Sequence, residues 1–324
     1  GAGFSYAVGP RFSETLRRKA ADVSSKKPNF EGKTTPLNTN SHDIQTTGAR
    51  RRRDLAQRRT YRQQTHAGDT AKAQQIGVRI VLASGRPTHG LEPIARALEL
   101  GLYGGFIIAY NGAVIIDATN GATIFERNIS PEMIPYLEKK EHKNNFAILT
   151  YRGDTLLTNN ASNPHVQAEA TLNGLRLVPV DELASAVDFA PHKCMLVSDD
   201  DEALSGLEAH WKKRLDGELD VFRSEPFFLE VVPCTVDKAN TLGVLLERLG
   251  LGREEVMAIG DGTCDVGMLQ LAGLGVAMGH APESVKRCAD RTTDSNTADG
   301  VAQAVEQFIL SDIHAAQVSL DQLN

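Results

Sequence analysis

Cysteine is scarce in this 324-residue chain, and its four cysteines lie far apart with no Cys-x-x-Cys pair. That pattern is typical of free thiols in a reducing compartment. No apolar run approaches the length of a membrane span, and the N-terminus lacks the apolar stretch of a signal peptide. We therefore expect a cytoplasmic protein with no membrane partner.

Acidic and basic residues are distributed unevenly, although the formal net charge is only −6. Residues 1–75 contain 15 Lys and Arg against 6 Asp and Glu, so the remainder of the chain is strongly acidic. An acidic body argues against nucleic acid as the main partner. The length predicts about two domains, and the hydrophobic content of 41% is enough for real cores.

Residues 1–75 have no sustained apolar periodicity and are rich in polar and basic side chains, including the arginines between Arg50 and Arg62. Such a composition buries too little apolar area to offset chain entropy, so we expect a disordered or atypical segment. The arginines are interpreted as a solvated leader. The weaker alternative is binding to an anionic partner such as nucleic acid.

From Ala71 onward the pattern becomes that of an α/β protein. Apolar runs at 79–83 and 106–109 flank a helical pattern, which predicts a βαβ unit with parallel strands. A helical face around Leu242–Leu249 and a strand at Val256–Ile259 continue the pattern. We predict a Rossmann-like parallel-sheet core over residues 76–117 and 226–311, with a tail at 312–324.

Residues 118–225 have a different pattern, in which short strand candidates alternate with helix candidates. This predicts an inserted α+β cap domain over the carboxyl ends of the core strands, where ligands of open α/β sheets bind. Asp199, Asp200 and Asp201 precede a predicted helix, so N-capping explains them better than a metal cluster does.

Two carboxylates, Asp261 and Asp265, follow the strand at Val256–Ile259. They would repel each other without a cation or proton, so a hard-cation site is the chemical interpretation, against the equal alternative of an ordinary loop. Ser84 with Arg86, and Lys238 at a helix start, are predicted at the same edge. A hydroxyl, a cation and an acid pair together predict a phosphate site with Mg²⁺.

At these residues the chain resembles the haloacid dehalogenase (HAD) superfamily, in particular its Cof-type sugar-phosphatase-like members with a class IIB α+β cap. Residues 81–87, Lys238 and residues 259–265 are similar to the second, third and fourth motifs, and residues 110–113 to an Asn-Gly signature. The resemblance implies catalytic roles for Lys238 and Ser84 and metal binding by Asp261 and Asp265. It implies substrate binding by Gly85, Arg86, Asn111 and Gly112.

One motif of that family is missing. The resemblance implies a first strand ending in Asp-x-Asp-Gly-Thr, whose first Asp attacks phosphorus and whose second is the general acid/base. Residues 1–75 contain no Asp-x-Asp, and the segment around Asp54 is the nearest approach. Smaller departures are Ala239 after the lysine, Cys264 in the fourth motif, and His280 after Met278-Gly279.

Two interpretations remain open. The region before Ala71 has a divergent start or a shifted reading frame, or the protein is a non-catalytic relative that binds phosphorylated ligands or a partner. The resemblance implies a Mg²⁺-dependent hydrolase of small phosphorylated metabolites such as sugar phosphates. Because the carboxylate nucleophile is missing, both interpretations predict little or no turnover.

Overall fold

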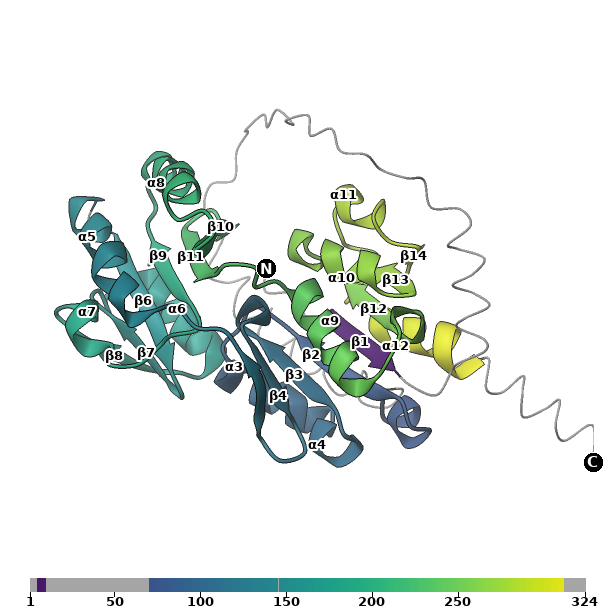
Figure 1. Ribbon diagram of the computed structural model, residues 1–324. Helices are drawn as coiled ribbons and strands as arrows, with labels where there is room; N and C mark the ends of the chain where they lie inside the picture. Colours follow the sequence, from purple (N-terminus) through teal and green to yellow (C-terminus); the bar gives the residue numbers. More distant parts are fainter. Residues whose placement is uncertain (1–4, 10–69, 145, 312–324) are drawn as a thin grey trace, which may run out of the picture.

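The computed structural model describes residues 5–9, 70–144 and 146–311, and contains two sheets with helices around each (Figure 1). The larger is eight-stranded, in the order β14-β13-β12-β1-β2-β3-β4-β5. Its strands are β1 (Ser5–Gly9), β2 (Arg79–Ala83), β3 (Phe106–Ala109), β4 (Val114–Asp117), β5 (Thr123–Glu126), β12 (Met257–Gly260), β13 (Leu274–Ala277) and β14 (Arg291–Thr292). We call this sheet and its helices the core.

Helices cover both faces of the core sheet and bury its central strands on both sides. In β2, Ile80 and Leu82 pack toward α3 and α12, whereas Val81 and Ala83 pack toward α9 and α10. The core helices are α3 (Thr88–Ala97), α4 (Leu100–Tyr103), α9 (Lys238–Leu249), α10 (Val266–Leu271), α11 (Glu283–Lys286) and α12 (Gly300–Val305). Short turns of other helix types are η1 (Tyr110–Gly112), η3 (Arg253–Glu255), η4 (Thr263–Asp265) and η5 (Glu306–Leu310).

The second sheet has six strands in the order β10-β11-β9-β6-β7-β8 and forms the inserted cap (Figure 1). Its strands are β6 (Ala147–Arg152), β7 (Thr155–Thr158), β8 (Arg176–Pro179), β9 (Cys194–Val197), β10 (Leu219–Glu225) and β11 (Phe228–Pro233). Its helices are η2 (Pro131–Met133), α5 (Ile134–Asn144), α6 (Pro164–Asn173), α7 (Leu183–Ala186) and α8 (Asp201–Arg214).

The predicted α/β class, with parallel strands in the core, is confirmed. The pairs β2–β3, β12–β13 and β13–β14 are parallel, and β2–β3 is the βαβ unit predicted from the apolar runs at 79–83 and 106–109. The chain passes from the core sheet to the cap sheet, and back again, later in the sequence than the boundaries predicted at 118 and 226. Strand β5 extends the core sheet by pairing with β4, and β11 belongs to the cap because it pairs with β9 and β10.

The central strand β1 was not predicted, since residues 1–75 were expected to be disordered or atypical. It lies between β2 and β12 and runs antiparallel to both. It thereby pairs the edges that β2 and β12 would otherwise expose. The arginine segment at 50–62 and the tail at 312–324 lie outside the described residues, as does Asp54.

Asp200 accepts a hydrogen bond from the backbone N–H of Ala203 at 2.9 Å, so it caps α8 as predicted. Among the described residues, no helix combines the length and apolar character needed to cross a bilayer.

Replacing Ala7 with proline tests the place of β1, because Ala7 pairs with Val81 on one side and Ala258 on the other. Proline removes a backbone donor and is excluded from central strands. We expect Ala7→Pro to lower the free energy of unfolding by about 2–4 kcal/mol. The control Ala7→Gly keeps the N–H and should cost about 1 kcal/mol or less. Equal denaturation curves for both variants would place this segment outside the sheet.

Candidate active site

Three strand ends bring the predicted residues to one edge of the core sheet. Ser84 follows β2, Tyr110 follows β3 and Asp261 follows β12. Strand β1 separates β2 from β12, so Ser84 and Asp261 follow strands about 10 Å apart, which is two strand spacings. Because β1 is antiparallel, its amino end lies at this edge.

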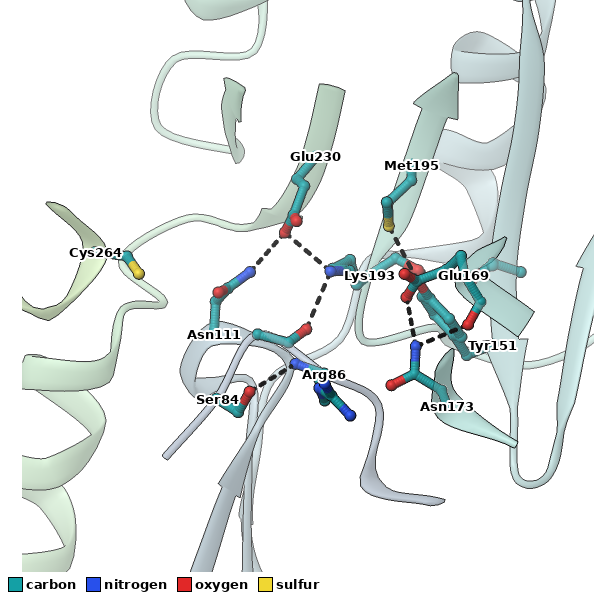
Figure 2. Close-up of polar contacts among 12 residues, drawn as sticks. Ser84, Arg86, Asn111, Tyr151, Glu169, Asn173, Lys193, Met195, Glu230 and Cys264 are labelled. Atoms are coloured by element: carbon teal, nitrogen blue, oxygen red, sulfur yellow. Dashed lines mark hydrogen bonds and ion pairs between the residues drawn. The ribbon is translucent and has the colours of Figure 1, made fainter. Parts of the chain in front are cut away.

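The turn Ser84–Arg86 presents polar groups at the end of β2. The Ser84 hydroxyl oxygen accepts from the Arg86 backbone N–H at 3.3 Å (Figure 2). The Ser84 carbonyl accepts from the Asn111 backbone N–H at 3.1 Å. The N–H of Gly85 has no hydrogen-bond partner among the described residues. Ser84 and Arg86 are buried, so this turn lies beneath the cap rather than on an open surface.

A second turn, Tyr110–Gly112, packs against the first. All three residues have positive φ, and a Cβ at Gly112 would lie 2.5 Å from the Asp237 carbonyl oxygen, so only glycine fits there. The Gly112 carbonyl accepts from the Thr241 hydroxyl at 2.7 Å, which ties the turn to the start of α9. A Cβ at Gly85 would lie 2.6 Å from the side-chain oxygen of Asn111. The Asn111 side chain therefore lies directly against Gly85.

Lys238 and Asp265 form a buried ion pair. Lys238 Nζ lies 2.7 Å from Asp265 Oδ1, and the two side chains are 2% and 0% exposed. Burial lowers the pKa of Lys238, but the adjacent charges of Asp265 and Cys264 outweigh it, so the net shift is upward from 10.5. The other oxygen of Asp265 accepts from the N–H groups of Asp261 and Gly262. Asp265 thus fixes both the lysine and the loop after β12.

Asp261 is the carboxylate in this loop that offers a ligand atom. Its Oδ2 lies 3.0 Å from His280 Nε2, whereas Oδ1 is buried and has no hydrogen-bond partner among the described residues. Mg²⁺ is commonly held by one or two carboxylates, with water and phosphate oxygens completing its shell. Asp261 fits such a site, and Asp265 would act mainly by shaping the loop. Within the described ranges no cluster of three potential metal ligands occurs.

The position between Ser84 and Asp261 contains no carboxylate from β1, whose sequence is Ser-Tyr-Ala-Val-Gly. The other Asp-x-Asp spacing in the chain, Asp199 to Asp201, lies in the cap. There Asp199 pairs with His165 at 2.7 Å and Asp201 with Arg223 at 2.7 Å. Neither aspartate therefore supplies the missing nucleophile.

Two charged cap residues that were not predicted from sequence reach this edge. Lys193 Nζ donates to Glu230 Oε2 at 2.9 Å and to the Gly85 carbonyl at 3.1 Å (Figure 2). Glu230 Oε2 also accepts from the Asn111 side chain at 2.6 Å. One signal could have revealed Glu230, which is the single charged residue in the apolar run of β11. Lys193 offers no comparable local signal.

Aromatic rings line the same boundary between cap and core. Tyr110 stacks on His192 of the cap with ring centroids 5.0 Å apart, and lies 5.8 Å from the ring of Tyr151. Burial lowers the pKa of His192, and Glu126 at 3.4 Å opposes this shift. Burial also raises the pKa of Tyr110 to about 12, so this phenol stays protonated at neutral pH.

Comparison with known proteins agrees with this arrangement. A family model described as haloacid dehalogenase-like hydrolase matches residues 57–305. A Bacillus subtilis phosphatase, named for 5-amino-6-(5-phospho-D-ribitylamino)uracil, is 31% identical over 74% of this chain and 85% of its own length. A haloacid dehalogenase-like hydrolase from Bacteroides thetaiotaomicron has a TM-score of 0.72 at 43% identity, covering 75% of this chain and 91% of that one.

A further solved structure, a HAD subclass IIB sugar phosphatase, has a TM-score of 0.62 over 75% of this chain and 91% of that chain. At 22% identity this likeness shows the fold alone. It confirms the predicted combination of a Rossmann-like core with an inserted cap.

Replacing Lys238 with methionine should leave Asp265 buried without its counter-charge. We expect Lys238→Met to lower the free energy of unfolding by roughly 3–5 kcal/mol, measured by chemical denaturation. The double variant Lys238→Met/Asp265→Asn should recover part of this loss, because asparagine still accepts from the loop N–H groups. The exposed pair of Lys212 and Glu208 on α8 provides the control, since Lys212→Met should cost about 0.5 kcal/mol or less. Similar losses for the two single variants would contradict the burial argument.

Proposed function

This chain belongs to the haloacid dehalogenase-like hydrolase family, and we propose that its site binds a small phosphorylated metabolite with Mg²⁺ but hydrolyses it slowly or not at all. The observation that carries the proposal is the convergence of a phosphate-binding turn, a buried lysine and an acidic loop on one sheet edge. The residues involved are Ser84, Gly85, Lys238, Asp261 and Asp265.

The phosphoryl group is proposed to lie between the ends of β2 and β12. The Ser84 hydroxyl and the Gly85 N–H would donate to its oxygens, as backbone and hydroxyl donors do in other phosphate sites. Lys238 would contribute positive charge, which burial keeps effective because screening by water is weak. Arg86, Asn111 and Gly112 shape the walls of the same region.

Mg²⁺ would be held by Asp261, with Asp265 fixing the loop that presents it. When bound, the metal would neutralise charge on the phosphoryl oxygens and make the phosphorus more electrophilic. The chain's own contribution is to hold the phosphate in place and to exclude water through the cap.

Turnover is proposed to be impaired because residues 1–75 contain no Asp-x-Asp motif. The family resemblance assigns attack to an aspartate at the end of the central strand, and β1 contains no acidic residue. Ser84 is not proposed as a substitute, since its hydroxyl hydrogen-bonds only to the Arg86 N–H, and to no base, among the described residues. The second candidate function, a non-catalytic phospho-ligand-binding or regulatory protein, is favoured by this same observation.

The substrate class is proposed from relatives as well as from the site. The name of the Bacillus subtilis relative specifies a phosphorylated ribityl compound, which is a small polar phosphomonoester. A sugar phosphate or a similar metabolite of the cytoplasm suits a phosphate site closed by a cap. This cellular location is also proposed because all four cysteines are free thiols in the structure.

Hydrolysis of p-nitrophenyl phosphate with Mg²⁺ tests the catalytic part of the proposal. We expect the full chain to show at most a trace rate, and Asp261→Ala to show the same rate, because the nucleophile is absent in both. A wild-type rate typical of enzymes, of about 1 s⁻¹ or more, and lost in Asp261→Ala, would instead show that another group attacks phosphorus.

Calorimetric titration with inorganic phosphate and a hexose 6-phosphate tests the binding part. We expect saturable binding that is strengthened by Mg²⁺ and weakened about tenfold by Ser84→Ala, since one donor to the phosphoryl group is lost. The control Ser205→Ala alters a hydroxyl on cap helix α8 and should bind like the wild type. Absence of binding by the wild-type chain would contradict the proposed function.

A further inference from the structure

Two charged cap residues form hydrogen bonds to core turns at this edge of the sheet, Lys193 to Gly85 and Glu230 to Asn111. We propose that Lys193 and Glu230 are positioning residues, which orient the donors of the turn Ser84–Arg86 toward a bound phosphoryl group. The inference rests on the proposed function, since it takes this turn as the phosphate-binding element. The hydrogen bonds from which the inference is argued are present whatever the site binds.

Lys193 acts on the peptide group between Gly85 and Arg86. Its Nζ donates to the Gly85 carbonyl at 3.1 Å, and the N–H of the same planar peptide donates to the Ser84 hydroxyl oxygen at 3.3 Å. Fixing the carbonyl therefore fixes the N–H. The N–H in turn occupies one acceptor position of the Ser84 hydroxyl, which leaves its hydrogen to donate elsewhere.

Glu230 acts on the peptide group between Ser84 and Gly85. Its Oε2 accepts from the Asn111 side chain at 2.6 Å, and the Asn111 backbone N–H donates to the Ser84 carbonyl at 3.1 Å. The plane of this peptide sets the direction of the Gly85 N–H, which has no partner among the described residues. Through Asn111, Glu230 thus sets the direction of the Gly85 N–H, which is the second proposed phosphate donor.

The pair itself is rigid and carried by the cap. Lys193 and Glu230 side chains are 3% and 7% exposed, and the strands that follow or carry them, β9 and β11, are paired. Lys193 Nζ also lies 5.8 Å from the ring of Tyr151. If the cap moved away from the core, the two residues would stay bonded to each other, and their bonds to Gly85 and Asn111 would break.

Close packing elsewhere holds the cap in this position. Helix α6 of the cap lies against α3 of the core, and a Cβ at Gly90 would be 2.4 Å from the side-chain oxygen of Asn173. The two cap–core bonds of the ion pair therefore form at a defined cap position. Phosphate affinity should depend on residues more than 100 positions away in sequence from the turn they orient.

The experiment compares two double variants with the wild-type chain, because removing either charge alone leaves the other buried and risks misfolding. Lys193→Met/Glu230→Leu removes both cap–core bonds and replaces the pair with apolar side chains. Lys193→Met/Glu230→Gln removes the bond to Gly85 but keeps an acceptor for Asn111. The control, Lys212→Met/Glu208→Leu, removes an ion pair on the surface of α8.

The first readout needs no ligand. Hydrogen exchange of the Arg86 and Asn111 amides, which both donate to Ser84, should be at least about tenfold faster in Lys193→Met/Glu230→Leu. The amides of Val81 and Leu82 in β2 should exchange at the wild-type rate. Unchanged exchange at Arg86 and Asn111 would overturn the positioning role, whatever the protein binds.

The second readout is the dissociation constant for inorganic phosphate with Mg²⁺. We expect it to rise about tenfold or more in Lys193→Met/Glu230→Leu, and by less in Lys193→Met/Glu230→Gln, with the unfolding midpoint near wild type. If the pair served only to stabilise the fold, a double variant with wild-type stability would bind phosphate with wild-type affinity. Wild-type affinity in a stably folded Lys193→Met/Glu230→Leu would therefore overturn the inference. If the wild-type chain itself binds no phosphate, the proposed function fails, and the exchange measurement still decides the positioning role.

Discussion

The buried ion pair of Lys238 and Asp265 is the interaction on which the site depends. It joins the start of α9 to the loop after β12, and both of its charges are withdrawn from water. A buried charge is tolerated only with its partner and with hydrogen bonds to the remaining atoms, and Asp265 has both. One oxygen of Asp261 has no hydrogen-bond partner in the described part of the chain, and the raised pKa of Lys238 keeps this lysine charged at physiological pH.

The central strand β1 has no acidic residue to place at this site. In an open parallel sheet, the carboxyl end of the middle strand would point at a ligand bound over the edge. Here the middle strand is antiparallel and has no acidic residue, so it completes the sheet without adding a carboxylate to this edge. The sheet is therefore closed by a strand without a carboxylate, beside a turn that we propose to hold a phosphoryl group.

Much of the core could be predicted from sequence because its signals are local. Strands β2 and β3 are short apolar runs, and Ser84 and Asp261 follow strand ends, which is enough to bring them to one edge. The family resemblance is confirmed as well. Strand β1 could not be predicted, because five residues in a polar segment acquire strand structure only from the two edges they pair with. The roles proposed for Lys193 and Glu230 could not be predicted either, because their contacts form only when the cap folds over the core. Lys193 is 108 residues from Gly85, and Glu230 is 119 residues from Asn111.

The most direct measurement is an experimental structure of the full chain with inorganic phosphate and Mg²⁺. The account predicts phosphate between the ends of β2 and β12, within hydrogen-bond distance of the Gly85 N–H and the Ser84 hydroxyl, with Mg²⁺ on Asp261 and Lys238 nearby. Phosphate bound elsewhere, with the Gly85 N–H and Asp261 left without it, would contradict the central claim.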